Sequence, residues 1–137
     1  MVREIFLHGA SPMTLIENSH KPRCRRQPSV RDEIARPCRL MEAAVAAVFA
    51  VPADELRAFS RRTAGVAFAR QSAMYLAHVA MGLSLSAVGR IFHRHRTTAA
   101  HACQMVEQRR DDPDVDRLLD TLENVCADIA RDNQMWP

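Results

Sequence analysis

ARQSAMYLAHVAMGLSLSAVGRIFHRHRTTAAHA, residues 69–102, is the stretch that decides the fold. Apolar residues between Gly65 and Ala80 recur three and four positions apart, which is the spacing of one face of an α-helix. Gly82 ends this predicted helix. Ser84 stands where an N-cap is expected, ahead of a second and shorter apolar stripe at residues 85–92. The pattern predicts two helices joined by a short connection.

A basic run follows, from His93 to Arg96, and its side chains cannot be buried together at any spacing. Thr97 and Thr98 supply hydroxyl groups suited to a helix start, so a third helix is expected from about Arg96 to Arg110. Two helices joined by a tight turn, with Arg, Thr and Thr opening the second, are the layout of a major-groove reader, because the N-terminal residues of a recognition helix meet base edges. We therefore expect a helix-turn-helix that binds DNA.

Basic and acidic residues lie in separate segments of the sequence, which the formal net charge of +3 does not reveal. Between positions 57 and 110 the only acidic residue is Glu107. The basic residues there are Arg57, Arg61, Arg62, Arg70, Arg90, Arg94, Arg96, Arg109 and Arg110. Such a segment attracts a phosphate backbone, with an affinity that falls steeply as salt rises. Acidic residues dominate from Asp111 to Asp132 and would orient the molecule rather than bind DNA.

Composition favours an all-α domain, because 47% of the residues are hydrophobic and only 5% are aromatic. The sequence also shows no segment in which apolar and polar residues alternate, as they do in a half-buried β-strand. Further helices are expected over Leu40–Ala50, just after Pro52, and after Asp112, where Pro113 opens a last helix. The apolar stripe of that last helix is Val115, Leu118, Leu119, Leu122, Val125 and Ile129. We expect it to cover the base of the recognition helix; a dimer face is the alternative.

Residues 1–37 differ from the rest, because prolines punctuate them and basic residues cluster without helical order. We expect a flexible basic N-terminal arm here, either lying along the DNA backbone or without a role, and a globular domain over residues 38–132. The chain shows neither a signal peptide nor an apolar run of membrane-spanning length. We therefore expect a cytoplasmic protein on the nucleoid, with no membrane partner.

Three motifs in the sequence resemble those of one known family. ARQSAMYL at 69–76, SLSAVGRIF at 84–92 and RHRTTAAHAC at 94–103 resemble ARQIAMYL, SLPEIGRxF and GRDHTTVxHAC of the C-terminal DNA-binding domain of DnaA, the bacterial replication initiator. The similarity runs from about Leu40 to about Leu122. It implies a small multi-helix domain of Trp-repressor-like architecture, with the recognition helix in the major groove.

The resemblance also implies DNA contacts outside the recognition turn. Arg62 would lie in the family's basic loop and enter the minor groove, where it senses groove width and A·T content. Arg70 and Gln71 match the family's RQ pair near the DNA. His78 stands where the family often has a phosphate-contacting lysine, and Ser86 where a proline usually packs near a base.

In the recognition turn the sequence both matches the family and departs from it. Thr97 and Thr98 match its Thr-Thr pair, whereas His95 and Arg96 replace its Asp-His pair; all four would lie at or near base edges. Aspartate accepts from the cytosine amino group, whereas His95 would donate to a guanine or a phosphate, and Arg96 also favours guanine. The preferred site is therefore expected to be related to the family's box but distinct from it. Each altered contact should discriminate between bases by roughly 1–3 kcal/mol.

Metal and catalytic sites are not expected. The cysteines form no CxxC pair, and Arg94 and Arg96 would repel a cation from the histidines at 93, 95 and 101, so that DNA contact by Arg94 and its neighbours is the better interpretation. No G-x-x-x-x-G-K-[ST] loop is present, so these residues should lack the ATPase of DnaA. Without a nucleophile, a carboxylate pair or a cofactor loop, the chain is not expected to be an enzyme or to need a cofactor.

These observations predict sequence-specific binding of double-stranded DNA by a transcriptional regulator. One alternative is a regulator of replication initiation that competes for initiator boxes. Another is an adaptor that recruits RNA polymerase or a second regulator. We expect a monomer on DNA, with a homodimer through the last helix as the alternative.

Overall fold

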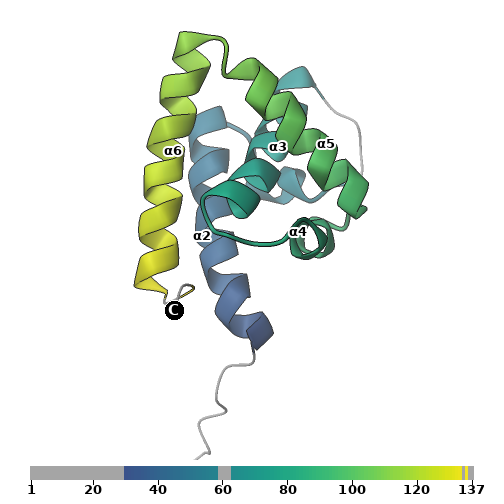
Figure 1. Cartoon of the computed structure of the whole chain (residues 1–137), viewed down its shortest axis with the longest axis vertical. Helices are drawn as coiled ribbons and strands as arrows, with labels where there is room; N and C mark the ends of the chain where they lie inside the picture. Colours follow the sequence, from purple (N-terminus) through teal and green to yellow (C-terminus); the bar gives the residue numbers. More distant parts are fainter. Residues whose placement is uncertain (1–29, 59–62, 134, 136–137) are drawn as a thin grey trace, which may run out of the picture.

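The computed structural model describes residues 30–58, 63–133 and 135, and all its regular elements are helical (Figure 1). They are α2 (Val30–Phe49), a single 3₁₀ turn η1 (Ala53–Leu56), α3 (Ala64–Val79), α4 (Leu85–Ile91), α5 (Arg96–Arg109) and α6 (Pro113–Asp132). The described part contains no β-strand. The predicted all-α class is confirmed, and the helices expected around the helix-turn-helix begin and end within a residue or two of their predicted positions.

Helix α2 begins earlier than the sequence predicted. Residues 30–37 were assigned to the arm, but the structure places them in the helix, so the predicted end of the arm was wrong. Pro37 lies inside α2, where it removes one main-chain hydrogen bond. It is fully buried, and Cys38, Met41 and Val45 are 0% exposed on the same helix. Burial of this apolar face stabilises the helix through the proline. Residues 1–29 of the expected arm lie outside the described residues.

Side-chain caps define where the helices start. Ser84 Oγ accepts a hydrogen bond from the Ala87 N–H at 3.1 Å, as predicted for α4. Asp112 caps α6, whose first residue is Pro113, also as predicted. The start of α5 differs from the prediction, because its N-cap is the ring of His95 rather than a threonine hydroxyl. Gly82, with a left-handed φ of 73°, lies within the connection between α3 and α4.

A turn over residues 92–95 joins α4 to α5. Its Phe92 side chain is fully buried, and the Arg94 N–H donates to the Gly89 carbonyl at 2.8 Å. A Cβ atom at position 89 would lie only 2.7 Å from the Arg94 carbonyl oxygen, so the close approach requires a glycine there. His93 adopts the left-handed conformation, with φ 53°. The tight turn fixes the start of α5 against the end of α4.

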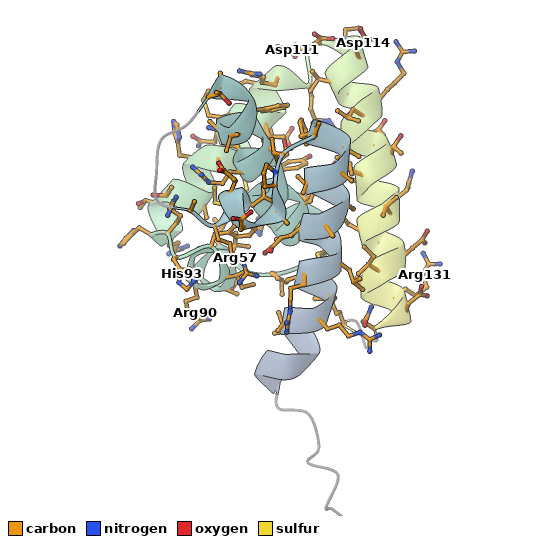
Figure 2. The ribbon with its side chains drawn as sticks, turned by 180° about the vertical axis from the view of Figure 1, so that it is seen from behind. Arg57, Arg90, His93, Asp111, Asp114 and Arg131 are labelled. Atoms are coloured by element: carbon orange, nitrogen blue, oxygen red, sulfur yellow. The ribbon has the colours of Figure 1, made fainter. Side chains whose placement is uncertain are left out.

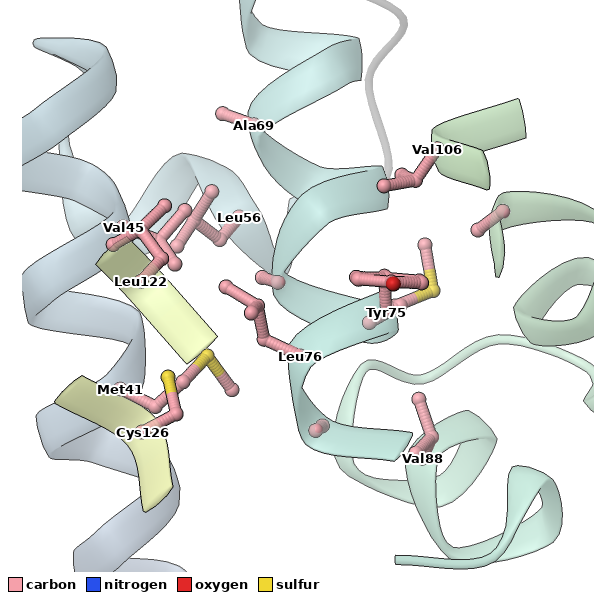
Figure 3. Close-up of a cluster of buried hydrophobic side chains, with 14 of the residues drawn as sticks. Met41, Val45, Leu56, Ala69, Tyr75, Leu76, Val88, Val106, Leu122 and Cys126 are labelled. Carbon is pink, nitrogen blue, oxygen red and sulfur yellow. The ribbon is translucent and has the colours of Figure 1, made fainter. Parts of the chain in front are cut away.

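Helix α3 lies at the centre of the domain and contacts α2, α4, α5 and α6. Figure 3 shows core side chains on both sides of it: Met41, Val45, Leu122 and Cys126 on one side, and Tyr75, Val88 and Val106 on the other. Helix α6 packs on α2 and α3. The expectation that its stripe covers the base of the recognition helix was therefore wrong, and Val125 of the stripe is 40% exposed.

One polar cluster joins α5 to α3 and α6. Arg110, directly after α5, donates to the Tyr75 hydroxyl at 2.9 Å and to Asp116 at 2.6 Å, and it also bonds to Asp120 and Glu123. The Tyr75 hydroxyl donates to Glu123 at 3.1 Å. Burial raises the pKa of Tyr75, opposed in part by the hydrogen bond from Arg110, so the phenol stays protonated. We call this cluster the Arg110 brace.

Candidate nucleic-acid interface

The first turn of α5 presents its side chains to solvent. His95, Arg96, Thr97 and Thr98 are all exposed. The same helix buries Ala99, Ala102 and Val106 against the core. Since small and apolar residues hold the helix from one side, the polar residues of its first turn are left available to a ligand. The structure thus brings together the four residues that the sequence assigned to base contacts.

The cap of α5 is formed by two of these residues. His95 Nδ1 accepts from the main-chain N–H of Thr97 at 3.4 Å and lies 3.0 Å from Thr97 Oγ1. The backbone of His95 is extended, with φ −70° and ψ 151°, as an N-cap requires. The ring is therefore held by the helix start instead of turning freely in solvent.

Helix α4 adds further exposed polar side chains to this end of the molecule. Ser86 lies in its first turn and Arg90 in its last, and both are exposed. Figure 2 shows Arg90 and His93 at one end of the domain and Asp111 and Asp114 at the other. Arg90 was absent from the predicted contacts; its position two residues after the buried Val88 was the signal that it faces outward. The separation gives the molecule a cationic end around the α4–α5 turn.

Arg70 supports the interface from inside. Its side chain is only 9% exposed, and it donates from Nε to the Leu56 carbonyl at 3.2 Å and from Nη2 to the Glu55 carbonyl at 2.8 Å. Burial lowers the pKa of Arg70, and the nearby Arg94 lowers it further. The neighbouring Gln71 is half-buried. DNA contact by Arg70 and Gln71 stays a prediction, while the hydrogen bonds give Arg70 a structural role as well.

Arg94 makes a matching contact from the α4–α5 turn. Its Nη2 donates to the Ala58 carbonyl at 2.6 Å. Together, Arg70 and Arg94 hold the main chain of residues 55–58, which comes shortly before Arg62 in the sequence. Arg62 itself lies outside the described residues, so its predicted entry into the minor groove stays a prediction.

His78 lies near the end of α3 and binds the connection to α4. Its Nδ1 is 2.7 Å from the Leu83 carbonyl oxygen. A carbonyl can only accept, so Nδ1 carries the hydrogen, and Nε2 of the neutral ring is an acceptor. The phosphate contact that the family resemblance implies for His78 stays a prediction; made through Nε2, it would require a hydrogen on that nitrogen as well.

Several of the arginines counted in the sequence have protein partners. Arg57 pairs with Glu42 at 2.7 Å, Arg109 lies 4.6 Å from the centre of the Phe68 ring, and Arg110 belongs to the brace. The cationic end is therefore formed by fewer arginines than the sequence count suggested. Arg90 and Arg96 are its exposed arginines among the described residues.

The described cysteines are buried or half-buried and unpaired with one another. Burial raises the pKa of Cys38 to about 11 and that of Cys126 to about 12. In the part of the chain that the structure covers, no three His, Cys, Asp or Glu side chains are grouped closely enough to hold a metal ion. None of its helices combines the length and apolar character that crossing a membrane requires.

In a comparison with known protein families, residues 39–106 match the family described as the bacterial dnaA protein helix-turn-helix. Chromosomal replication initiator protein DnaA 1 of Protochlamydia amoebophila is 43% identical over 65 residues, which are 47% of this chain and 14% of that protein. Chromosomal replication initiator protein DnaA 2 of Chlamydia trachomatis is 38% identical over 90 residues, which are 65% of this chain and 19% of that protein. The chain thus spans less than a fifth of the length of these relatives.

Proposed function

Residues 39–106 belong to the DNA-binding helix-turn-helix family of bacterial DnaA proteins, and we propose that this chain uses the domain as a sequence-specific regulator of transcription. The observation that carries the proposal is the exposed first turn of α5, where Arg96, Thr97 and Thr98 follow the cap at His95. These side chains have the length and polarity to reach base edges in the major groove.

The other predicted contacts fix the position of the protein on the duplex. In the proposal Arg62 enters the minor groove, His78 and Arg94 contact phosphates, Arg70 and Gln71 lie near the DNA, and Ser86 lies near a base. Contacts of this kind orient a protein but carry little sequence information, apart from the minor-groove arginine. Arg90, exposed on α4, joins this group as a phosphate contact.

Regulation of replication initiation is the second candidate, and the relatives favour it, because they are named as chromosomal replication initiator proteins. In that function the protein would occupy or compete for initiator boxes. The two candidates differ in the site that is read. His95 and Arg96, which depart from the family's motif, favour a site of its own over the unmodified box.

Genome-wide occupancy of the tagged protein in its native host distinguishes the candidates. Occupancy of promoters that disappears in an Arg62→Ala, Thr98→Ala variant supports the transcriptional function. Peaks at initiator boxes near the origin favour the replication function instead. Occupancy that is unchanged in the variant contradicts both, because recruitment by another protein would then dominate.

Binding to a selected duplex in vitro tests the surface itself. Arg96→Ala is expected to weaken binding and to relax base preference at one position, whereas Arg90→Ala weakens binding to all sequences and lowers the salt slope by about 1. Arg117→Ala is the matched control, since its side chain is 77% exposed on α6 at the acidic end. An equal effect of Arg117→Ala would show that the attraction is diffuse rather than local to the α4–α5 turn.

A further inference from the structure

The cap of α5 determines where the hydrogen atoms of its two members lie. The main-chain N–H of Thr97 points at His95 Nδ1, at 3.4 Å. A hydrogen on Nδ1 would face that N–H directly, so the cap requires Nδ1 to keep its lone pair. The hydrogen of the neutral imidazole is then on Nε2, on the far side of the ring from the cap.

The same bond fixes the hydroxyl of Thr97. Its Oγ1 lies 3.0 Å from His95 Nδ1. Because Nδ1 is an acceptor, the hydroxyl donates its hydrogen to the ring and shares the lone pair with the main-chain N–H. The lone pairs of Oγ1 remain for an outside partner, and both side chains are exposed.

We propose that His95 and Thr97 act as a donor–acceptor pair of fixed polarity that specifies one step of the DNA site. This rests on the proposed function, in which the first turn of α5 meets base edges. His95 presents the Nε2–H donor, which matches guanine N7 and O6, adenine N7 or thymine O4, and which excludes the cytosine amino group. Thr97 presents an acceptor, which matches the amino groups of adenine and cytosine.

Two substitutions at position 95 distinguish the role of His95 as a hydrogen-bond donor to a base from its role as the N-cap of α5. His95→Asn keeps an oxygen for the cap and an N–H₂ donor for the base. His95→Asp keeps the cap but offers the base only acceptors. Asparagine and aspartate are both favourable N-cap residues, so both variants should unfold at temperatures close to that of the unmodified protein.

Selection of bound duplexes from a random pool gives the readout. The unmodified protein and His95→Asn are expected to select a base with an acceptor edge at one shared position. His95→Asp is expected to select cytosine there, with a preference reversed by about tenfold to a hundredfold. The ring itself supplies a readout without DNA: ¹H–¹⁵N correlation spectra of the imidazole in its neutral form should show the hydrogen of His95 on Nε2.

Three results would overturn the proposal. One is a His95→Asp variant that selects the unmodified site. Another is a His95→Asp variant that binds every sequence more weakly to the same extent, which would mean that His95 contacts a phosphate. The third is a spectrum with the hydrogen on Nδ1. A pool from which even the unmodified protein enriches no sequence contradicts the proposed function instead, while the spectrum still tests the tautomer.

Discussion

At position 89 the difference between a hydrogen and a methyl group decides whether the α4–α5 turn can close. Gly89→Ala would place a Cβ atom 2.7 Å from the Arg94 carbonyl oxygen and 3.3 Å from the Arg96 nitrogen. These are main-chain atoms that cannot rotate away, so we expect a loss of about 1–3 kcal/mol in the free energy of unfolding and a weaker complex with DNA. Urea unfolding and titration with a selected duplex measure the two effects.

Gly65→Ala is the matched control for this prediction. It lies in the first turn of α3, where the nearest atom to an added Cβ is Thr63 Oγ1 at 4.0 Å. Alanine is the better helix former, so the control is expected to gain up to about 1 kcal/mol. Equal losses at both positions would show that the tight turn is not the cause.

Residue types and motifs predicted which side chains are exposed at the start of α5 better than they predicted the hydrogen-bond partners of the other candidate side chains. The four residues of the first turn of α5 were identified from the sequence and are all exposed. The carbonyl partners of Arg70 and His78 were not foreseen. A carbonyl group exists at every position, and only the tertiary fold determines which one meets a given guanidinium or imidazole group.

Two residues that follow helices have a left-handed backbone, and one of them is an alanine and the other a glycine. Ala50, just after α2, has φ 54°, and Gly82, after α3, has φ 73°. A side chain costs about 1–2 kcal/mol in this left-handed region, partly offset by the greater freedom of glycine in the unfolded chain. We expect Ala50→Gly to raise the free energy of unfolding by about 0.5–1 kcal/mol and Gly82→Ala to lower it by a similar amount. Thermal unfolding of both variants checks the signs, and two changes of the same sign would refute the explanation.

The Arg110 brace makes α5 depend on α6. Arg110→Met is expected to lower the free energy of unfolding by about 1–3 kcal/mol, because Tyr75 and Glu123 lose a partly buried partner. The value is below the roughly 3–5 kcal/mol for breaking a fully buried ion pair, because Asp116 and Asp120 are 44% and 57% exposed and solvent screens them.

Arg117→Met serves as the control for the brace. Arg117 and Asp114 form an exposed pair on α6, with side chains 77% and 87% exposed. Its loss should change stability by less than about 0.5 kcal/mol. Calorimetry that found equal changes for both variants would show that the brace contributes no more than a surface ion pair.

Element boundaries were predictable wherever a cap or a left-handed glycine marks them, as at Ser84, Gly82 and Asp112. The early start of α2 was missed because Pro37 signals a helix end locally, whereas burial of its ring and of the residues beside it outweighs that signal. The partners of α6 were missed for a different reason. An apolar stripe shows that a face is buried but not which helix buries it.

Alkaline pH should destabilise the whole domain through its buried thiols. The pKa of Cys38 is raised from 9.0 to about 11 and that of Cys126 from 9.0 to about 12 in the folded state. The native state then holds more protons than the unfolded state above pH 9, so the stabilisation is fully present below pH 9 and is lost as pH rises toward the folded values. The expected slope is roughly 1.4 kcal/mol per pH unit for each thiol.

Chemical unfolding at a series of pH values from 7.5 upward measures this slope. A Cys38→Ala, Cys126→Ala variant is expected to be less stable throughout, because cavities replace the thiols, but to lose less stability per pH unit. The buried Tyr75 phenol, whose pKa is also raised, leaves a residual slope in the variant. Identical slopes in the two proteins would mean that the thiols do not cause the alkaline transition.

At the scale of the whole molecule, the residues of α5 that we propose to contact bases lie apart from the residues that pack the helix into the core, although His95 also caps the helix. Positions 95–98 are exposed, while the same helix is held by Ala99, Ala102 and Val106 from its other side. A substitution that alters the preferred sequence therefore meets little resistance from selection for folding. Over evolutionary time, one such scaffold can be redirected to new binding sites by a few substitutions, which makes the turn also the natural place to engineer a different specificity.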